Sequence, residues 1–221
     1  LADALGEGAD AARFRERAGS WRNTYDPTSG FFTGRHEDGS FVAGREDRWQ
    51  DWYAEGNARQ YLWLVPYDPD GLADVMGGRD VMLDRLRTFF EESARERRTV
   101  APPKWYWHGN EPDIHASFLF TAMGEAAEGG RWSRWVARDW YGDGPTGLPG
   151  NDDAGTMSAW LAFATIGVFP IAGEEHYLIG SPLSTRTELA GGGGVFVIEA
   201  PEASDTAAAL SAASLDGAPL L

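Results

Sequence analysis

The sequence of 221 residues contains no cysteine, which excludes disulfide bridges and metal sites built on thiolates. Any bound metal would therefore be a hard ion held by oxygen or histidine ligands. Basic residues are few, 19 against 34 acidic ones, and the formal net charge is −15. Proteins that bind nucleic acids present a basic face, so this balance argues against a nucleic-acid partner. No apolar run approaches the roughly 20 residues of a membrane-spanning helix, and we expect no membrane span.

Hydrophobic residues make up 43 % of the chain, which is enough for one core. Apolar residues recur at helical spacing in several segments separated by loops rich in glycine and proline. We expect helices over 10–26, 57–65, 77–97, 112–128, 130–141 and 156–169. The Gly129–Gly130 pair predicts the break between the fourth and fifth of these.

The character of the sequence changes after Pro170. Short β-type runs cover 175–180 and 194–201, and an Asp-Gly signal within 208–220 predicts a hairpin. The expected architecture is thus mainly α, with a helical body over 1–170 and a short β segment over 171–221. No sequence repeat of fixed period is visible, so antiparallel helix pairs with long loops indicate a helical toroid or an irregular bundle.

Three polar loops each lead directly into an expected helix, and each carries carboxylates beside a glycine. "WYAEGNARQY" contains Glu55, "WYWHGNEPDIH" contains Asn110 and Glu111, and "GLPGNDDAGTMS" contains Asp152 and Asp153. Helix capping explains any one of them, because carboxylates complement a helix N-terminus. Three such loops at corresponding helix ends of a toroid would converge on one cavity, which indicates a functional site.

Several carboxylates with aromatic walls suit glycoside hydrolysis, in which one carboxylic acid protonates the leaving oxygen and a carboxylate activates water. Tryptophan rings give flat platforms for sugars, and several of them lie beside these loops. The loop tryptophans are Trp49, Trp52, Trp105 and Trp107. The same oxygen-rich loops suit Ca²⁺, although no EF-hand pattern is present. His108 and His115 flank Glu111, and their spacing argues against a zinc site.

Three segments resemble, in order, the motifs of glycoside hydrolase family 92: "EGNARQYLWLVPYD", "HGNEPDIH" and "GLPGNDDAGTMSAWLAFATIGVFPIAG". The segments 1–32 and 177–183 are similar to the family's flanking regions. The resemblance implies a calcium-dependent, exo-acting α-mannosidase that inverts the anomeric centre. It also implies that the chain is the later part of an (α/α)6 toroid with a C-terminal β segment, in a longer protein with an N-terminal β-sandwich.

The resemblance assigns roles by position. Glu55 matches the general acid, and Asp153, with Asp152 beside it, matches the carboxylates that position and deprotonate the water; which of the two is the base stays open, and Asp153 is favoured. Asn110 and Glu111 match the calcium-binding loop. The resemblance implies that the ion holds two sugar hydroxyls. For inversion, the Glu55 and Asp153 carboxyls are expected about 6.5–9.5 Å apart.

Further expectations concern the substrate. Trp52, Trp107 and His108 are the candidates for contact with it, with a supporting role as the alternative for His108. Glu55 argues against the family members that carry Gln there and cleave phosphate-linked mannose. Tyr106 and Trp107 stand where α-1,2-specific members carry His-Glu, so α-1,3 or another linkage is equally expected. The alternatives are a catalytically inactive fragment that acts as a carbohydrate-binding or structural module, and a toroid hydrolase of other α-glycosides.

The resemblance implies an extracellular or cell-surface location and a role in the degradation of N-glycans. The Ala-, Arg- and Gly-rich, Lys-poor composition points to a bacterial source.

Overall fold

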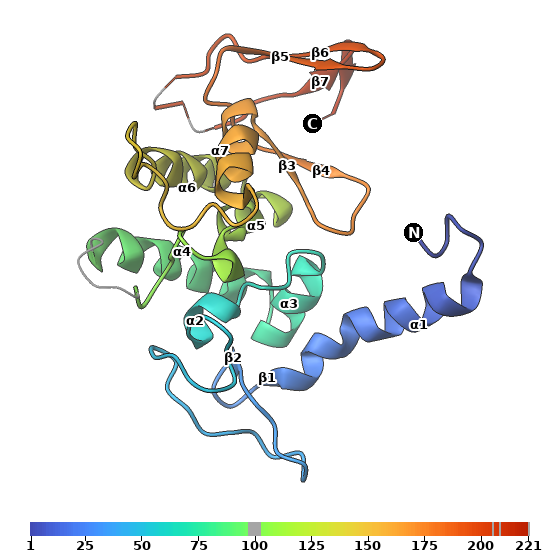
Figure 1. Ribbon diagram of the computed structural model, residues 1–221, viewed down its shortest axis with the longest axis vertical. Coiled ribbons are helices and arrows are strands. Elements are labelled where there is room, and N and C mark those ends of the chain that lie inside the picture. Colours follow the sequence, from blue (N-terminus) through green and yellow to red (C-terminus); the bar gives the residue numbers. More distant parts are fainter. Residues whose placement is uncertain (97–102, 205, 208, 221) are drawn as a thin grey trace.

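The computed structural model describes residues 1–96, 103–204, 206–207 and 209–220. Within these ranges the chain is mainly α, as the sequence predicts (Figure 1). The helices are α1 (Gly8–Ala18), α2 (Ala58–Tyr61), α3 (Pro69–Met76), α4 (Arg79–Glu96), α5 (Ala116–Ala122), α6 (Ala126–Asp139) and α7 (Thr156–Ile166), with the 3-10 turns η1 (Gly19–Thr24) and η2 (Glu111–Asp113).

The strands pair only as local antiparallel ribbons. They are β1 (Tyr25–Asp26) with β2 (Phe31–Phe32), β3 (Val168–Pro170) with β4 (Tyr177–Ile179), β5 (Arg186–Gly191) with β6 (Gly194–Glu199), and β7 (Ser214–Leu215) with β8 (Ala218–Pro219). The expected hairpin near the C-terminal end is β7–β8, and its turn has positive φ at Asp216 (49°) and Gly217 (80°). A two-residue turn of that kind matches the twist of a tight hairpin.

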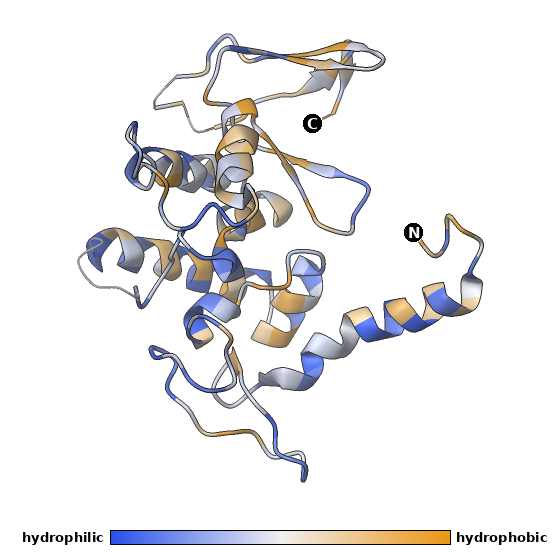
Figure 2. Ribbon diagram, in the orientation of Figure 1, coloured by the Kyte–Doolittle hydropathy of each residue, from blue (hydrophilic) through white to orange (hydrophobic). Residues whose placement is uncertain are grey.

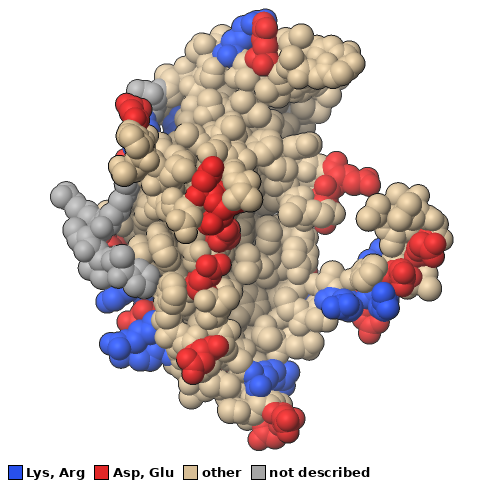
Figure 3. Space-filling view, viewed as in Figure 1, with Lys and Arg blue, Asp and Glu red and all other residues tan. Residues whose placement is uncertain are grey.

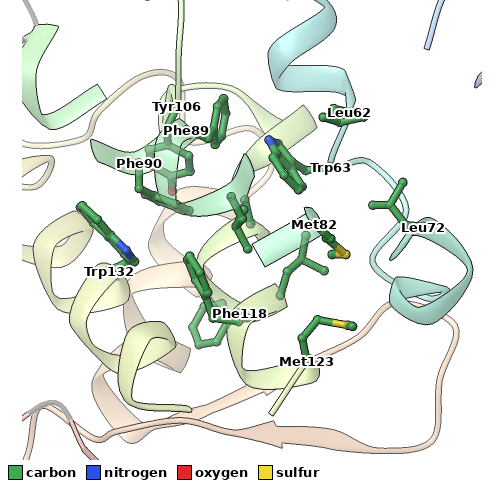
Figure 4. Close-up of a cluster of buried hydrophobic side chains, with 14 of the residues drawn as sticks. Leu62, Trp63, Leu72, Met82, Phe89, Phe90, Tyr106, Phe118, Met123 and Trp132 are labelled. Carbon is green, nitrogen blue, oxygen red and sulfur yellow. The ribbon is translucent and has the colours of Figure 1, made fainter. Parts of the chain in front are cut away.

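The core lies among α2 to α7 and is rich in aromatic rings (Figure 4). Phe90 of α4 is at its centre: its ring lies 4.6 Å from that of Tyr106 and 5.1 Å from that of Trp132 in α6. Phe118 of α5 stacks on Phe169 of β3 at 4.0 Å. Aromatic contacts of this kind add to the hydrophobic stabilisation of the core, and they fix α4, α5, α6 and β3 relative to one another.

The break between α5 and α6 differs from the prediction. The sequence suggested one helix over 112–128 that ends at Gly129–Gly130, but α5 stops at Ala122 and α6 runs through both glycines. A Cβ on Gly129 would lie 2.4 Å from Oγ1 of Thr121. The glycine therefore lets α6 pack closely against α5, and it marks a helix contact rather than a helix end.

Several elements differ from the prediction: the expected helix over 10–26 ends as α1 at Ala18, and the elements not predicted are β1, β2, β3, α3 and β5. α3 begins at Pro69 after the cap Asp68, whose Oδ1 accepts a hydrogen bond from the Gly71 amide at 3.1 Å. Its short "PDGLADVM" sequence reads as a turn, because Asp-Gly is a common turn signal. β5 was also missed, because its residues lack the β-branched pattern of β6.

The C-terminal hairpins lie against one end of the helical body and remain exposed. Arg134 of α6 is buried and donates to the Ser181 hydroxyl at 2.8 Å, the Pro182 carbonyl at 2.7 Å and the Ser204 carbonyl at 3.2 Å. This guanidinium holds the chain that leaves β4 onto α6. An open hollow of about 990 Å³ lies between α7, β3–β4 and the later hairpins.

Among the described residues, no helix is both long enough and apolar enough to cross a membrane. α1 extends away from the helical body, and Ala11 is its one buried residue (Figure 1). The chain leading into α7 is hydrophilic, whereas α7 itself is pale to orange on the hydropathy scale (Figure 2).

Candidate functional site

The loop that carries Glu55 is anchored by a capping box at the start of α2. The Asn57 side chain accepts hydrogen bonds from the amides of Arg59 and Gln60 at 2.9 and 3.2 Å, and the Gln60 side chain accepts one from the Asn57 amide at 3.0 Å. Asn57 and Gln60 are both buried. Their remaining N–H groups donate to the carbonyls of residues 103–105 at distances of 2.9–3.2 Å. The pair thus joins the Glu55 loop to the chain that leads to Asn110.

Glu55 itself lies at the surface between these anchors. Its amide donates to the Tyr61 hydroxyl at 3.1 Å, and its carbonyl accepts from Nδ2 of Asn110 at 2.6 Å. Both bonds use the backbone of Glu55, so neither of them occupies its carboxyl, and the residue is exposed. Asn110 is buried and joins the first two of the three loops directly.

The second loop is folded back on itself around Asp113. Oδ2 of Asp113 accepts from the Trp107 amide at 3.0 Å, and the Trp107 carbonyl accepts from the Asn110 amide at 3.2 Å. Asp113 is 1 % exposed, and burial raises the pKa of its carboxyl well above the ordinary value. These bonds set the direction in which the segment Asn110–Glu111 leaves the loop.

The second and third loops touch through two glycines. A Cβ on Gly109 would lie 2.5 Å from the Pro149 carbonyl oxygen, and a Cβ on Gly150 would lie 2.4 Å from the Gly109 carbonyl oxygen. Because backbone faces backbone there, neither position has room for a side chain. The contact brings the loop of Asn110 and Glu111 against the loop of Asp152 and Asp153.

The third loop reaches α7 through left-handed backbone. Asp153, Ala154 and Gly155 have φ values of 46°, 57° and 95°, and for residues with a side chain this region is unfavourable. Oδ1 of Asp152 accepts from the Ser158 amide at 2.9 Å and so caps the first turn of α7. Asp152 therefore has a structural partner, whereas the Asp153 side chain is exposed.

The three loops meet through the bond from Asn110 to the Glu55 carbonyl and through the contact of Gly109 with Pro149 and Gly150. Partial burial, followed by the charges of Glu111 and Asp153, raises the pKa of the Glu55 carboxyl above its ordinary value. A raised pKa extends the pH range in which a carboxyl is protonated, and a general acid has to be protonated to act. The ion pairs recorded among the described residues include none of Glu55, Glu111, Asp152 and Asp153.

Figure 3 shows acidic groups along the middle of the face that displays α7 and α2, with no basic group among them. An unbalanced cluster of carboxylates favours a cation. The donors here are all oxygens, from Asn110, Glu111 and the aspartates, and hard ions such as Ca²⁺ prefer such a set. Within the described ranges, however, no three His, Asp or Glu side chains come together closely enough to enclose a metal. The donor chemistry fits calcium, and the protein side chains alone do not complete its coordination.

His108 is placed differently from an expected sugar contact. It is fully buried, its Nδ1 lies 2.5 Å from the Tyr106 hydroxyl, and its Nε2 lies 2.8 Å from the Tyr141 hydroxyl. Its ring packs on Trp160 with centroids 4.2 Å apart. Both nitrogens face other side chains of the protein, which agrees with a supporting role and not with contact to a substrate.

The two tryptophan candidates have different surroundings. Trp52 packs against Gly34 and Gly44, and its Nε1 is buried without a hydrogen-bond partner. Trp107 is half-buried and lies beside Trp49, with ring centroids 6.4 Å apart and planes tilted by 37°. Trp49 is 47 % exposed, so this pair presents aromatic surface to solvent.

Sequence reasoning missed the residues that hold these groups in place. Asn57 and Gln60 have a sequence signal, because a capping residue followed three positions later by Gln is the pattern of a capping box. Tyr141 has no such signal, since it meets His108 across 33 positions of the sequence.

Comparison with known proteins finds one family model and several related proteins. The family model described as "Glycosyl hydrolase family 92 catalytic domain" matches residues 1–220. A family GH92 inverting mannosidase from Bacteroides thetaiotaomicron VPI-5482 superposes with a TM-score of 0.88 at 28 % identity, covering 99 % of this chain and 32 % of that one. A family GH92 alpha-mannosidase from Bacteroides thetaiotaomicron gives a TM-score of 0.78 at 33 % identity, covering 89 % of this chain and 26 % of that one.

A curated relative, an uncharacterized secreted glycosidase of Arthroderma benhamiae, is 28 % identical over 204 residues, which are 80 % of this chain and 25 % of the relative. The chain therefore spans about a quarter of that relative and 26–32 % of the two structures above. The mainly α chain has the fold of the corresponding part of their catalytic domains.

Proposed function

Because the chain belongs to glycosyl hydrolase family 92, we propose that the protein containing it is a glycosidase that releases terminal α-linked mannose with inversion. The observation that carries this proposal is that the loops of Glu55, Glu111 and Asp153 meet: Nδ2 of Asn110 donates to the Glu55 carbonyl at 2.6 Å, and Gly109 packs against Pro149 and Gly150. A raised pKa on one of two nearby carboxyls is the pattern that separates an acid from a base.

The reaction needs two proton transfers. Protonated Glu55 gives its proton to the glycosidic oxygen as the bond from that oxygen to the anomeric carbon breaks. Asp153 takes a proton from a water molecule whose oxygen forms the new bond to the anomeric carbon from the opposite face. Asp152 caps α7 and so holds the loop of Asp153 in place.

Asn110 and Glu111 would hold a calcium ion in this site. When bound, the ion supplies positive charge that attracts sugar hydroxyl oxygens and offsets the mutual repulsion of the carboxylates. Calorimetric titration of Ca²⁺ into the protein, with Glu111→Ala as the control, tests the assignment. Binding that the variant loses supports it, and equal binding by both proteins contradicts it.

The substrate proposal is an α-mannoside glycan, with the linkage left open between α-1,2, α-1,3 and others. Trp107 and its neighbour Trp49 offer the aromatic surface for a sugar ring, and Trp52 supports the loop beside Glu55. We also propose an extracellular location, since the curated relative is described as secreted. The division into a toroid part, 1–170, and a β segment, 171–221, belongs to the same proposal; β3 lies before this boundary and pairs with β4 after it.

The decisive experiment is an assay of the full-length protein on α-mannosides, with the anomeric configuration of the first product followed by NMR. Inverted mannose, formed in a reaction that EDTA stops, is the expected result. Retained configuration would exclude Asp153 as the base that activates water for a single displacement. Release of another sugar from α-glycosides, without release of mannose, would indicate a toroid hydrolase of different specificity, and binding without hydrolysis would indicate a carbohydrate-binding module.

A further inference from the structure

A buried hydrogen-bond chain joins the loop of residues 105–111 to the N-terminal end of α7. The Tyr106 hydroxyl lies 2.5 Å from Nδ1 of His108, and Nε2 of His108 lies 2.8 Å from the Tyr141 hydroxyl. The Tyr141 hydroxyl in turn donates to the Met157 carbonyl at 2.7 Å. These residues belong to three separate segments of the chain.

The donors and acceptors in this series of hydrogen bonds follow from its last member, the Met157 carbonyl. A carbonyl can only accept, so Tyr141 uses its one proton on Met157 and must receive a proton from Nε2 of His108. In a neutral imidazole with its proton on Nε2, Nδ1 of His108 accepts from the Tyr106 hydroxyl, and every group in this series of hydrogen bonds has a partner.

Both ends of this hydrogen-bond series lie next to groups of the proposed site. His108 precedes Gly109 and Asn110, the residues that touch the Pro149–Gly150 segment and the Glu55 carbonyl. At the other end, the Met157 amide donates to the Asp152 carbonyl at 3.3 Å. Tyr141 also lies close enough to Asp152 for that charge to act on its hydroxyl.

The aromatic packing around His108 supports the same connection. Trp160 of α7 packs against both His108 and Tyr141: its ring is 4.2 Å from the imidazole and stacks on the Tyr141 ring at 6.0 Å with an angle of 10°. The Trp160 Nε1 donates to the Ile114 carbonyl at 2.9 Å, beyond η2. The two loops are thus held to α7 by directional bonds in addition to hydrophobic contact.

We propose that Tyr141, acting through His108, is a positioning residue that holds the Asn110–Glu111 loop in register with the Asp152–Asp153 loop; this inference rests on the proposed function. Tyr141 touches no substrate in this role. Its hydroxyl completes a bond path that runs from the second loop to the first turn of α7. Removing it takes away the acceptor of the buried His108 Nε2–H, and a protein relieves such a loss by moving the groups concerned.

The test compares Tyr141→Phe, Tyr106→Phe and the double variant in the full-length protein. The matched control is Tyr67→Phe, which also removes a hydroxyl bound to a carbonyl, that of Ala18 at 3.2 Å, in another part of the chain. Two quantities are measured: hydrogen exchange of the peptides covering 105–111 and 150–158, and kcat and KM on an α-mannoside. The exchange measurement does not depend on activity.

For Tyr141→Phe we expect faster exchange in both segments and a kcat lower by about 10- to 100-fold, with KM within about threefold, because displaced groups lose reaction geometry more than binding. The double variant should be no worse than the worse single variant, because both changes interrupt one chain. Tyr67→Phe should match the wild type. His108→Gln, which keeps a donor, should retain more activity than His108→Phe.

Unchanged exchange and kcat in Tyr141→Phe would overturn the inference, and so would independent, multiplicative effects of the two tyrosine changes. If Tyr141→Phe does not fold, the His108→Gln and His108→Phe pair decides, and equal activity in both overturns the inference. A wild-type protein without activity on α-mannosides would instead remove the proposed function. In that case, hydrogen exchange in 105–111 and 150–158 still decides whether the hydrogen bonds of His108 and Tyr141 couple the two loops.

Discussion

The loops that carry Glu55 and Asp153 lead into their helices in opposite ways. The first is fixed by buried side chains, with Asn57 and Gln60 satisfying one another and the carbonyls of 103–105. The second is exposed and passes through three consecutive left-handed residues, 153–155. The proposed acid is therefore held by the core, whereas the proposed base depends on contacts made by its neighbours.

This difference fits the two roles. A general acid benefits from a raised pKa, and burial, followed by the charges of Glu111 and Asp153, raises that of Glu55. A base must reach a water molecule, and strained backbone at functional sites persists only where the surroundings enforce it. Around Asp153 the surroundings are the Gly109–Gly150 contact and the cap that Asp152 gives to Ser158.

The largest expected effect comes from removing either carboxyl. Glu55→Gln and Asp153→Asn should each lower kcat by about 10²- to 10⁴-fold in the full-length enzyme and leave the fold intact, because each removes one proton transfer. An α-mannoside with a 2,4-dinitrophenolate leaving group, which needs no proton, should restore most of the rate to Glu55→Gln and none to Asp153→Asn. Near-wild-type rates in either variant would contradict the roles. A greater loss in Asp152→Asn would move the base to Asp152.

Sequence reasoning could predict the loops because their signals are local. Charged residues beside glycine before an amphipathic segment predicted where α2, η2 and α7 begin, and the helical period over 77–97 gave α4 to within two residues at each described end. The prediction of a helix end at Gly129 was wrong. This residue is close to Thr121 of the preceding helix, and a contact between helices cannot be recognised from the local sequence pattern.

The burial of His108 could not be predicted for the same reason. A histidine that directly precedes Gly109 and the site residues Asn110 and Glu111 is expected at the surface as long as its partners are unknown. Those partners are Tyr106, which was considered only for linkage specificity, and Tyr141, which lies beyond α6. The candidate carboxylates could be found from short motifs, whereas the groups that support them are distributed over the tertiary structure.

The contact between the loops can be broken with one methyl group. Gly109→Ala places a Cβ 2.5 Å from the Pro149 carbonyl oxygen, and overpacking of this kind typically lowers the free energy of unfolding by about 1–3 kcal/mol. The shift should displace the Asp153 loop more than the Glu55 loop and lower kcat. Gly144→Ala is the control, since no atom lies within 4 Å of its added Cβ. Equal unfolding free energies for the two variants, from denaturant titration, would contradict the close contact.

The caps of α2 and α7 give a direct comparison of the two loops. Asn57→Ala removes a buried cap and should lower the free energy of unfolding by about 1–2 kcal/mol. Asp152→Ala removes a more exposed cap, and we expect a smaller loss of about 0.5–1 kcal/mol. Asp152→Asn keeps an acceptor for the Ser158 amide and should preserve most of that stability. A larger loss in Asp152→Ala than in Asn57→Ala, measured by denaturant titration, would mean that the third loop is the better anchored.

The smallest effect concerns the strain itself. Ala154 has φ 57°, a conformation that disfavours residues with a side chain by about 1–2 kcal/mol, whereas glycine there adds about 0.4–1 kcal/mol of entropy to the unfolded chain. Ala154→Gly should therefore raise the free energy of unfolding by about 0–1.6 kcal/mol, seen as a small rise in Tm. Asp216→Gly relieves the same conformation in the β7–β8 turn, away from the site, and should leave kcat unchanged. If kcat falls in Ala154→Gly while stability rises, the left-handed backbone serves to aim Asp153. If both stay level, the site depends only on the contacts around the loop.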